Sequence, residues 1–160
     1  MGVEYPDTEE VRTALRRAGY DPEITVLDES VHTAALAAAR LGVPVGAIAN
    51  SLIFDADGEA LLVLTSGAHR VDTDWLAGRL GDGPLRRASP DFVRTHTGQP
   101  IGGVAPVGHP APLRTVVDTE LARFPQLWAA GGHPRTVFPI DYPTLVRITA
   151  GTESAVVDGR

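Results

Sequence analysis

The sequence predicts a mixed α/β fold, in which β-hairpins alternate with helices around a mixed sheet. The strongest signal is a hairpin, because two apolar, β-prone runs at 49–55 and 59–65 are joined through Asp57-Gly58, a dipeptide typical of tight turns. Segments with helical spacing of apolar residues and with capping residues lie on both sides of it. This order does not fit the strict βαβ alternation of a doubly wound sheet.

Two helices and a short strand are expected before the hairpin. Asp7 offers an N-cap followed by an acidic first turn, and Gly19 ends this first helix. A short strand at 24–27 follows. The alanine-rich segment 33–41 predicts the second helix, which Gly42 closes.

After the hairpin, cap signals predict two further helices. Asp72 begins one that extends to about residue 80, and Ser89 followed by Pro90 begins another that reaches about residue 95. A glycine-rich segment at 98–108 separates them from the last third of the chain. The remaining predicted elements are strands at 114–117, 127–130 and 136–140, a short helix at 119–124, a helix at 141–147 and a last strand at 153–157.

The composition excludes several kinds of site. The 160-residue chain has no cysteine, so disulfides, zinc–thiolate sites and thiol nucleophiles are excluded. All fourteen basic residues are arginine, which removes Schiff-base chemistry and a P-loop lysine. A net charge of −6 argues against binding nucleic acid through a broad basic face, although a few arginines around a pocket could still engage it. We expect one domain over 1–160, and because no apolar run is long enough to span a bilayer, a cytoplasmic location.

An ordered set of segments resembles a known family. The helix at 33–42 is followed by Ile48-Ala49-Asn50-Ser51-Leu52-Ile53-Phe54, the hairpin, Ser66-Gly67-Ala68-His69-Arg70-Val71-Asp72, Thr97-Gly98 and Ile101-Gly102-Gly103-Val104-Ala105-Pro106-Val107-Gly108. Together, over about 30–157, they look like the YbaK/ProX family of aminoacyl-tRNA deacylases and synthetase-associated editing domains. The resemblance implies a mixed, partly closed β-sheet or barrel wrapped by helices, and a pocket opening at the sheet. It also implies hydrolysis of the ester that joins a wrong amino acid to a tRNA 3′ end, of the Cys- or Ala-tRNA(Pro) type, with a tRNA 3′ end and an aminoacyl-tRNA synthetase as partners.

The sequence departs from this family at one position. Where the family typically carries a lysine that meets the substrate, this chain has Asn50, and no other lysine exists to replace it. An asparagine amide can donate a hydrogen bond but brings no positive charge. Three readings therefore stay open: an active or weakened deacylase, a binding module that retains the pocket without efficient hydrolysis, and a related hydrolysis in which Asn50 orients water on a different ester.

The resemblance also implies which residues form the site. The predicted catalytic residues are Asn50, Gly102 and Gly103, because backbone N–H groups of a glycine-rich turn can approach a substrate and stabilise an oxyanion. The predicted substrate-binding residues are Ser51, Ser66, Gly67, Thr97, Gly98 and His133. Simpler structural roles remain for most of them: strand-end hydrogen bonds for the serines, and turns for the glycines and the histidine.

The other chemistry-bearing residues are expected to be structural. His96, His109 and His133 lie beside glycine and proline loops and could reach a common site, but their spacing matches no metal signature, so neither a metal nor a cofactor is expected. The four arginines closest to a basic cluster are expected on a solvated face, with contact to tRNA phosphates as the alternative; they are Arg70, Arg86, Arg87 and Arg94.

Overall fold

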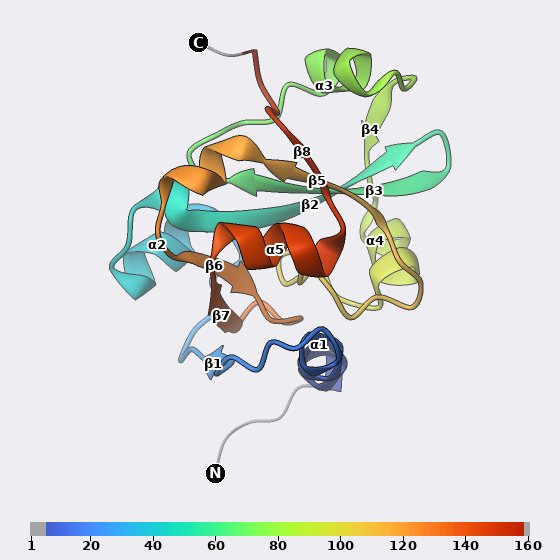
Figure 1. The fold of residues 1–160 in the computed structure, drawn as a ribbon. Helices are drawn as coiled ribbons and strands as arrows, with labels where there is room; N and C mark the ends of the chain where they lie inside the picture. Colours follow the sequence, from blue (N-terminus) through green and yellow to red (C-terminus); the bar gives the residue numbers. More distant parts are fainter. Residues whose placement is uncertain (1–5, 159–160) are drawn as a thin grey trace.

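The computed structural model describes residues 6–158 and folds them into one mixed sheet surrounded by helices (Figure 1). The elements in chain order are α1 (Pro6–Arg17), β1 (Thr25–Val26), α2 (Ala34–Leu41), η1 (Val45–Ala47), β2 (Ile48–Ala56), β3 (Glu59–Ser66), α3 (Thr73–Leu80), β4 (Leu85–Arg87), α4 (Pro90–Thr97), β5 (Arg114–Asp118), η2 (Thr119–Arg123), β6 (Leu127–Ala130), β7 (Thr136–Ile140), α5 (Tyr142–Thr149) and β8 (Thr152–Ser154).

The sheet mixes parallel and antiparallel pairs, as the sequence predicts. The strand order is β1-β7-β6-β2-β3-β5-β8, with β4 attached to β2 outside this path. The predicted hairpin is the centre of the sheet, where β2 and β3 pair from Ala49–Ser66 to Ala56–Glu59. Among the described residues, β1 and β8 do not pair with each other, so the sheet stays mostly open instead of closing into a barrel.

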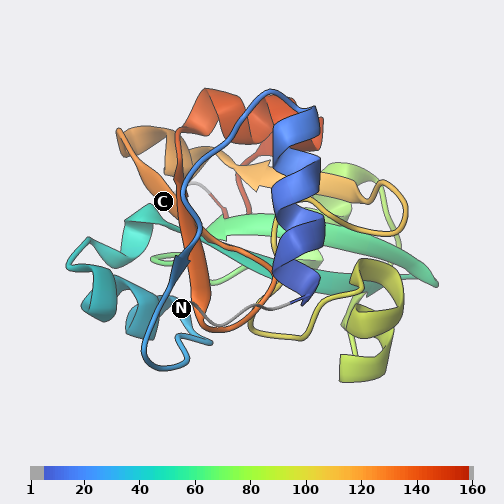
Figure 2. The same cartoon turned by 90° about the horizontal axis from the view of Figure 1, so that it is seen from below.

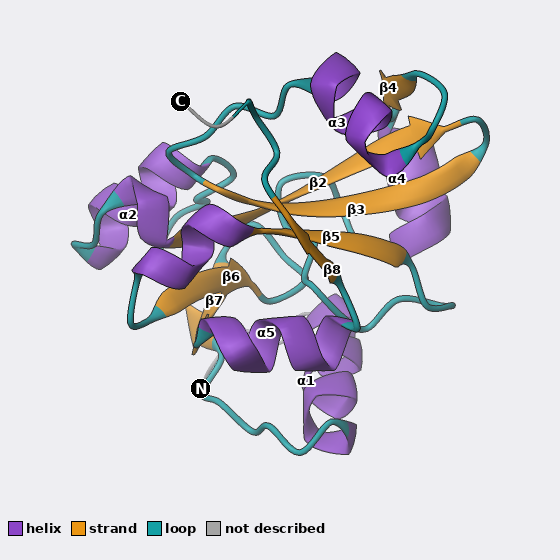
Figure 3. Ribbon diagram, turned by 45° about the horizontal axis from the view of Figure 1, so that its top comes forward, coloured by secondary structure: helices purple, strands orange, loops and turns teal. Residues whose placement is uncertain are grey.

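Helices cover both faces of the sheet, and each covers a separate part of the core. The largest apolar cluster lies under α1, α4 and α5, to which they contribute Val11, Val93 and Leu145. A second cluster lies between the hairpin and α3, which contributes Leu76. A third joins α2 to the start of β2 through Ala37 and other residues. Figure 2 shows α1 crossing beside the β1–β7 edge, and Figure 3 shows α3 and β4 together at the opposite end of the molecule.

The capping predictions are confirmed at two helices and shifted at a third. The Asp72 side chain accepts a hydrogen bond from Trp75 N at 3.1 Å, and Ser89 does the same for Phe92 N at 3.1 Å. The first helix begins at Pro6, so Asp7 belongs to its first turn instead of preceding it.

Two strands differ from the prediction. Strand β4 was not predicted, because a three-residue strand has almost no periodicity of its own and forms only by pairing with β2 at Phe54–Ala56. The last strand covers Thr152–Ser154 instead of 153–157, since only these residues have partners on β5.

Candidate functional site

The central strand β2 has a gap along one of its two edges. Its other edge pairs with β3 throughout, while this edge pairs with β6 only at Ile48–Ala49 and with β4 only at Phe54–Ala56. Over residues 50–53, no strand in the described part of the chain pairs with this edge. The gap exposes the main chain in the middle of a buried sheet, where a ligand can reach it.

The hydrogen-bond register shows which main-chain groups face the gap. Gly67 N donates to Ile48 O at 2.9 Å, so the polar main-chain groups of Ile48 point towards β3. Because directions alternate along an antiparallel strand, those of Asn50 and Leu52 also point towards β3, and those of Ser51 and Ile53 point into the gap. The N–H and carbonyl of Ser51 are thus directed into the gap, while the carbonyl of Ile53 lies at the end of the β4 ladder.

A pocket opens at the first half of the gap, between the start of β2, the N-terminus of α2, strands β6 and β7, and the loop at 102–104. It encloses about 460 Å³, including the open space at its mouth. Its walls are mostly small apolar side chains such as Ala49 and Ala129, and its lining contains no aspartate, glutamate or arginine. His32 is the one titratable side chain in this lining. We call this site the neutral pocket.

Asn50 and Ser51 are the polar side chains that β2 contributes to the neutral pocket. The Asn50 amide, half-buried, has no hydrogen-bond partner in the described part of the chain. The Ser51 hydroxyl is buried and likewise lacks a partner. Since an unpaired buried hydroxyl costs about 1–3 kcal/mol, this position favours a ligand or a water molecule that can pair with it.

The glycine wall of the neutral pocket requires glycine at both predicted positions. Gly102 has φ +86°, and a Cβ there would lie 3.0 Å from His32 Cβ. A Cβ on Gly103 would lie 2.6 Å from the carbonyl carbon of His133 and from Pro134 N, which is closer than Cβ atoms pack. Because glycine has no Cβ, the loop can lie this close to the pocket and to the 131–134 turn.

The two glycine amides are not equivalent. Gly103 N already donates to Pro100 O at 3.0 Å and closes a tight turn. Gly102 lines the neutral pocket, and its N–H has no partner among the described residues. Of the two predicted oxyanion donors, Gly102 is thus the one whose N–H is available, while Gly103 provides the close packing.

A buried glutamine, which the sequence analysis did not single out, holds the glycine loop. Gln99 accepts a hydrogen bond from Ala105 N at 2.7 Å and donates to Val107 O at 3.2 Å and Gly108 O at 3.3 Å. Thr97 Oγ1 accepts a hydrogen bond from Gln99 N at 3.0 Å and donates one to Val93 O at 2.7 Å. One amide side chain thus spans the loop that forms the pocket wall.

The other predicted binding residues surround the neutral pocket without lining it. Thr97 and Gly98 end α4 and border a separate hollow beside His109. Ser66 is buried and donates to Gly46 O at 2.8 Å, and Gly67 packs against Val45. His133 Nδ1 accepts from Arg135 N at 3.1 Å, behind Gly103. These contacts support the pocket, and their part in substrate binding stays a prediction.

A buried carboxylate that the sequence analysis did not predict anchors the end of the hairpin. Asp118 is fully buried and accepts hydrogen bonds from Ser66 N at 2.9 Å, Thr65 Oγ1 at 3.2 Å and Glu120 N at 3.0 Å. His69 Nδ1 lies 2.9 Å from the same carboxylate. The only sequence signal was an aspartate before a short helix, which is typical of an N-cap and does not indicate burial.

The histidines do not gather at one centre. The rings of His96 and Phe92 lie with centroids 4.3 Å apart and are tilted by 41° to each other, and His109 Nε2 lies 2.9 Å from Ala105 O, away from the neutral pocket. Burial lowers the pKa of His109 below its ordinary value. Within residues 6–158, no group of three histidine, aspartate or glutamate side chains has the geometry of a metal site.

The family follows from a comparison with known sequences. A model described as the aminoacyl-tRNA editing domain matches residues 28–148. The chain belongs to this editing family. The matched residues include all the predicted site residues, whose roles stay predictions.

Similar proteins connect this editing chain with prolyl-tRNA synthetase. It is 38% identical over 90 residues to the proline–tRNA ligase of Nitratidesulfovibrio vulgaris (strain Hildenborough); the match covers 56% of this chain and 16% of the ligase, so the chain spans about a sixth of that relative. It is 31% identical over 123 residues to protein YwhH of Bacillus subtilis (strain 168), covering 76% of this chain and 78% of YwhH.

Solved structures share the whole fold. A protein proposed to be a trans-editing enzyme for prolyl tRNA synthetase superposes with a TM-score of 0.91 at 38% identity, covering 98% of this chain and all of the other. The hypothetical protein APE2540 superposes with a TM-score of 0.83 at 28% identity, covering 92% of this chain and 98% of the other. The mixed, open sheet of this editing chain is therefore the fold of these proteins as well.

Proposed function

We propose that this chain is a deacylase that hydrolyses the ester between a small, wrongly attached amino acid and the 3′ end of tRNA(Pro). The observation that carries the proposal is the neutral pocket at the gap in β2, whose lining includes Gly102, Asn50 and Ser51. Among the described residues, the Gly102 N–H and the Asn50 and Ser51 side chains have no hydrogen-bond partner. The small walls favour a small side chain such as that of alanine or cysteine. The editing family and its prolyl ligase relatives support the choice of substrate class.

The residues of the neutral pocket suit ester hydrolysis by a positioned water molecule. Water adds to the ester carbonyl, and the negative charge that grows on the carbonyl oxygen is stabilised by donors such as Gly102 N–H and the Asn50 amide. The bond to the ribose oxygen then breaks, and that oxygen takes up the proton lost by the water. The lining offers no carboxylate as a base, so positioning and oxyanion stabilisation supply most of the rate.

Asn50 favours a second candidate function. In place of a positive lysine it offers a neutral amide, and one preorganised donor in an oxyanion site is worth on the order of 10²–10³ in rate. A pocket that has lost such a donor could hold an aminoacyl-tRNA end without turning it over efficiently. The binding module is therefore the alternative to the deacylase.

Deacylation of a panel of mischarged tRNAs decides between the two candidates. We expect alanyl- and cysteinyl-tRNA(Pro) to be hydrolysed clearly above the spontaneous rate at low salt, and Asn50→Lys to raise that rate. Folded protein that leaves the whole panel at the spontaneous rate, before and after Asn50→Lys, would exclude the deacylase.

A further inference from the structure

A second hollow continues from the neutral pocket along β2. It lies over the second half of the gap, between β4, the start of α3 and the tip of the glycine loop, and it encloses about 1150 Å³ with its open mouth. Ser51 and Val104 line both hollows, so the two adjoin at these residues. We call this second hollow the arginine cleft.

The floor of the arginine cleft is apolar and partly exposed. Leu52 and Phe54 lie on one face of β2, and Val71 and Ile101 border them from the neighbouring loops. Ile101 is 57% exposed at the tip of the glycine loop. An exposed isoleucine beside an open apolar floor suits the flat apolar face of a planar ligand such as a nucleobase.

The charges of the arginine cleft have one sign. Arg70 and Arg87 are the charged side chains in its lining, which contains no aspartate or glutamate. Arg87 stands opposite Phe54 in the β2–β4 ladder, so the guanidinium rises from the same face as the apolar floor. Both arginines are exposed, and the side chain of neither makes an ion pair or hydrogen bond within residues 6–158.

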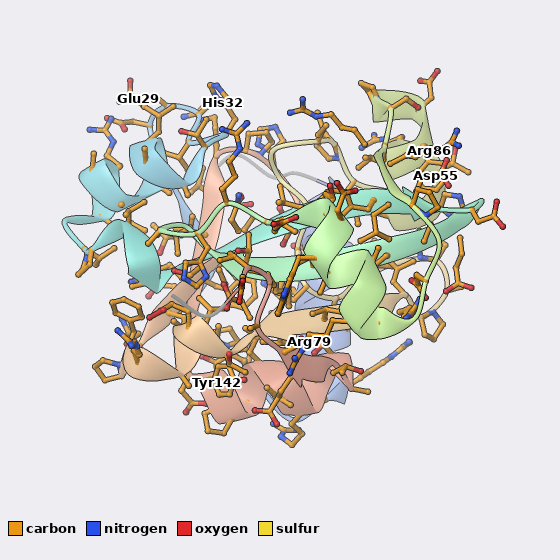
Figure 4. All side chains as sticks on the ribbon, turned by 90° about the horizontal axis from the view of Figure 1, so that it is seen from above. Glu29, His32, Asp55, Arg79, Arg86 and Tyr142 are labelled. Atoms are coloured by element: carbon orange, nitrogen blue, oxygen red, sulfur yellow. The ribbon has the colours of Figure 1, made fainter. Side chains whose placement is uncertain are left out.

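These free guanidinium groups contrast with the arginines elsewhere. Several of these, such as Arg12, Arg40 and Arg114, pair with a carboxylate, although Arg17 and Arg86 do not within residues 6–158. In a chain with a net charge of −6, two unpaired arginines at one cleft leave a local positive site that fits a polyanion. Figure 4 shows Arg86, the neighbour of Arg87, at the far end of β2 from His32, which lines the neutral pocket.

We infer that the arginine cleft binds the single-stranded 3′-terminal nucleotides of an RNA, with Arg70 and Arg87 on their phosphates and the apolar floor under a base. The inference rests on the proposed function and deepens it, because the junction at Ser51 would let the terminal ribose ester enter the neutral pocket. Because the binding is confined to this cleft, it is compatible with the net negative charge of the whole chain.

The test uses an uncharged acceptor-stem RNA hairpin that ends in single-stranded ACCA, labelled for fluorescence anisotropy. We expect the double variant Arg70→Gln/Arg87→Gln to bind it at least about 10-fold more weakly. We also expect the slope of log affinity against log salt to shrink by about 1.4, or about 0.7 for each lost phosphate contact. A control on α1, Arg16→Gln/Arg17→Gln, removes the same formal charge, although Arg16 pairs with Asp21 at 3.0 Å, and it should retain the wild-type affinity and slope.

The probe carries no amino acid, so its binding does not depend on hydrolysis. If the wild type deacylates no substrate but its RNA binding depends on Arg70 and Arg87, the proposed function fails and this inference stands. If the wild type deacylates and the double variant has an unchanged KM and RNA affinity, the inference is overturned. Equal weakening by the α1 control, or equal binding of a hairpin without ACCA, would overturn it as well.

Discussion

The neutral pocket and the arginine cleft lie on the same open edge of β2, yet they differ in size and charge. With its open mouth the neutral pocket measures about 460 Å³, and its lining has no carboxylate or guanidinium among the described residues. The arginine cleft measures about 1150 Å³ with its mouth, and its two arginines have no side-chain partner within residues 6–158. A small uncharged space suits the reacting ester, and a larger positive one suits the nucleic acid that carries it. If the two sites act as proposed, mutations in the neutral pocket should lower kcat, and mutations in the arginine cleft should raise KM.

The loop at 99–109 is the part that the two sites share. Its tip contributes Gly102 to the neutral pocket and Ile101 to the arginine cleft, and Val104 lines both. The loop contains no regular element, so its overall shape depends on the hydrogen bonds of Gln99. Gly102 and Gly103 set how closely its tip packs against His32 and the 133–134 turn. A mutation that destabilises the whole loop should therefore reduce both deacylation and RNA binding. A mutation in the wall of one site should reduce only the property of that site.

Loosening the loop should have the largest effect. Gln99→Leu keeps the volume but removes three hydrogen bonds and leaves their main-chain partners buried, so we expect a loss of about 2–4 kcal/mol in the free energy of unfolding. Deacylation and RNA binding should both fall. Urea unfolding and both assays measure this, with exposed Gln126→Leu as the control. A Gln99→Leu protein of wild-type stability and activity would show that the loop holds its shape without this residue.

Gly103→Ala should break the neutral pocket and spare the arginine cleft. The new Cβ would meet the main chain of His133 and Pro134 at 2.6 Å, so the wall must shift. We expect deacylation to fall by on the order of 10², because misplacing catalytic groups by about 1 Å costs that much. RNA binding should stay within a few-fold of wild type. The control is Gly78→Ala in α3, where a Cβ meets nothing within 4 Å; equal kinetics in both variants would contradict the prediction.

Asn50→Ala tests the neutral pocket without moving its walls. The Asn50 amide has no partner among the described residues, so its removal should leave the melting temperature almost unchanged. We expect kcat to fall by about 10–10², with little change in KM, because the amide acts on the charge that develops in the transition state. A rise in KM at constant kcat would instead make Asn50 a binding residue.

The smallest effect concerns the far end of the shared loop. Burial lowers the pKa of His109 in the folded state, while its Nε2 lies 2.9 Å from Ala105 O. The unfolded chain therefore takes up a proton first as the pH falls below about 6.5, and the folded state loses stability there. Above that pH the contribution is complete. His109→Gln should reduce the fall in the free energy of unfolding between pH 7 and 5. If the fall is unchanged in the variant, titratable groups other than His109 cause it.

Local signals predicted most of the fold and only part of the site. Asp57-Gly58, Asp72 and Ser89 act within a few residues, and their turn and caps are all present. The gap in β2 arises from where β4 and β6 stop pairing, which depends on distant segments and leaves no local pattern.

The same limit explains the residues that the sequence analysis missed. Gln99 and Asp118 are polar residues that become structural because they are buried among main-chain donors, and burial is a tertiary property. The choice between Gly102 and Gly103 as donor likewise depended on a single turn hydrogen bond to Pro100.

The proposal that the neutral pocket hydrolyses these esters is tested by single-turnover hydrolysis of alanyl- and cysteinyl-tRNA(Pro) by the wild type and by Gly103→Ala. We expect the wild type to exceed spontaneous hydrolysis at least about 10-fold. We also expect Gly103→Ala to return close to the spontaneous rate while it still binds the ACCA hairpin. A folded wild type that leaves both substrates at the spontaneous rate, or a Gly103→Ala variant as active as the wild type, would contradict it.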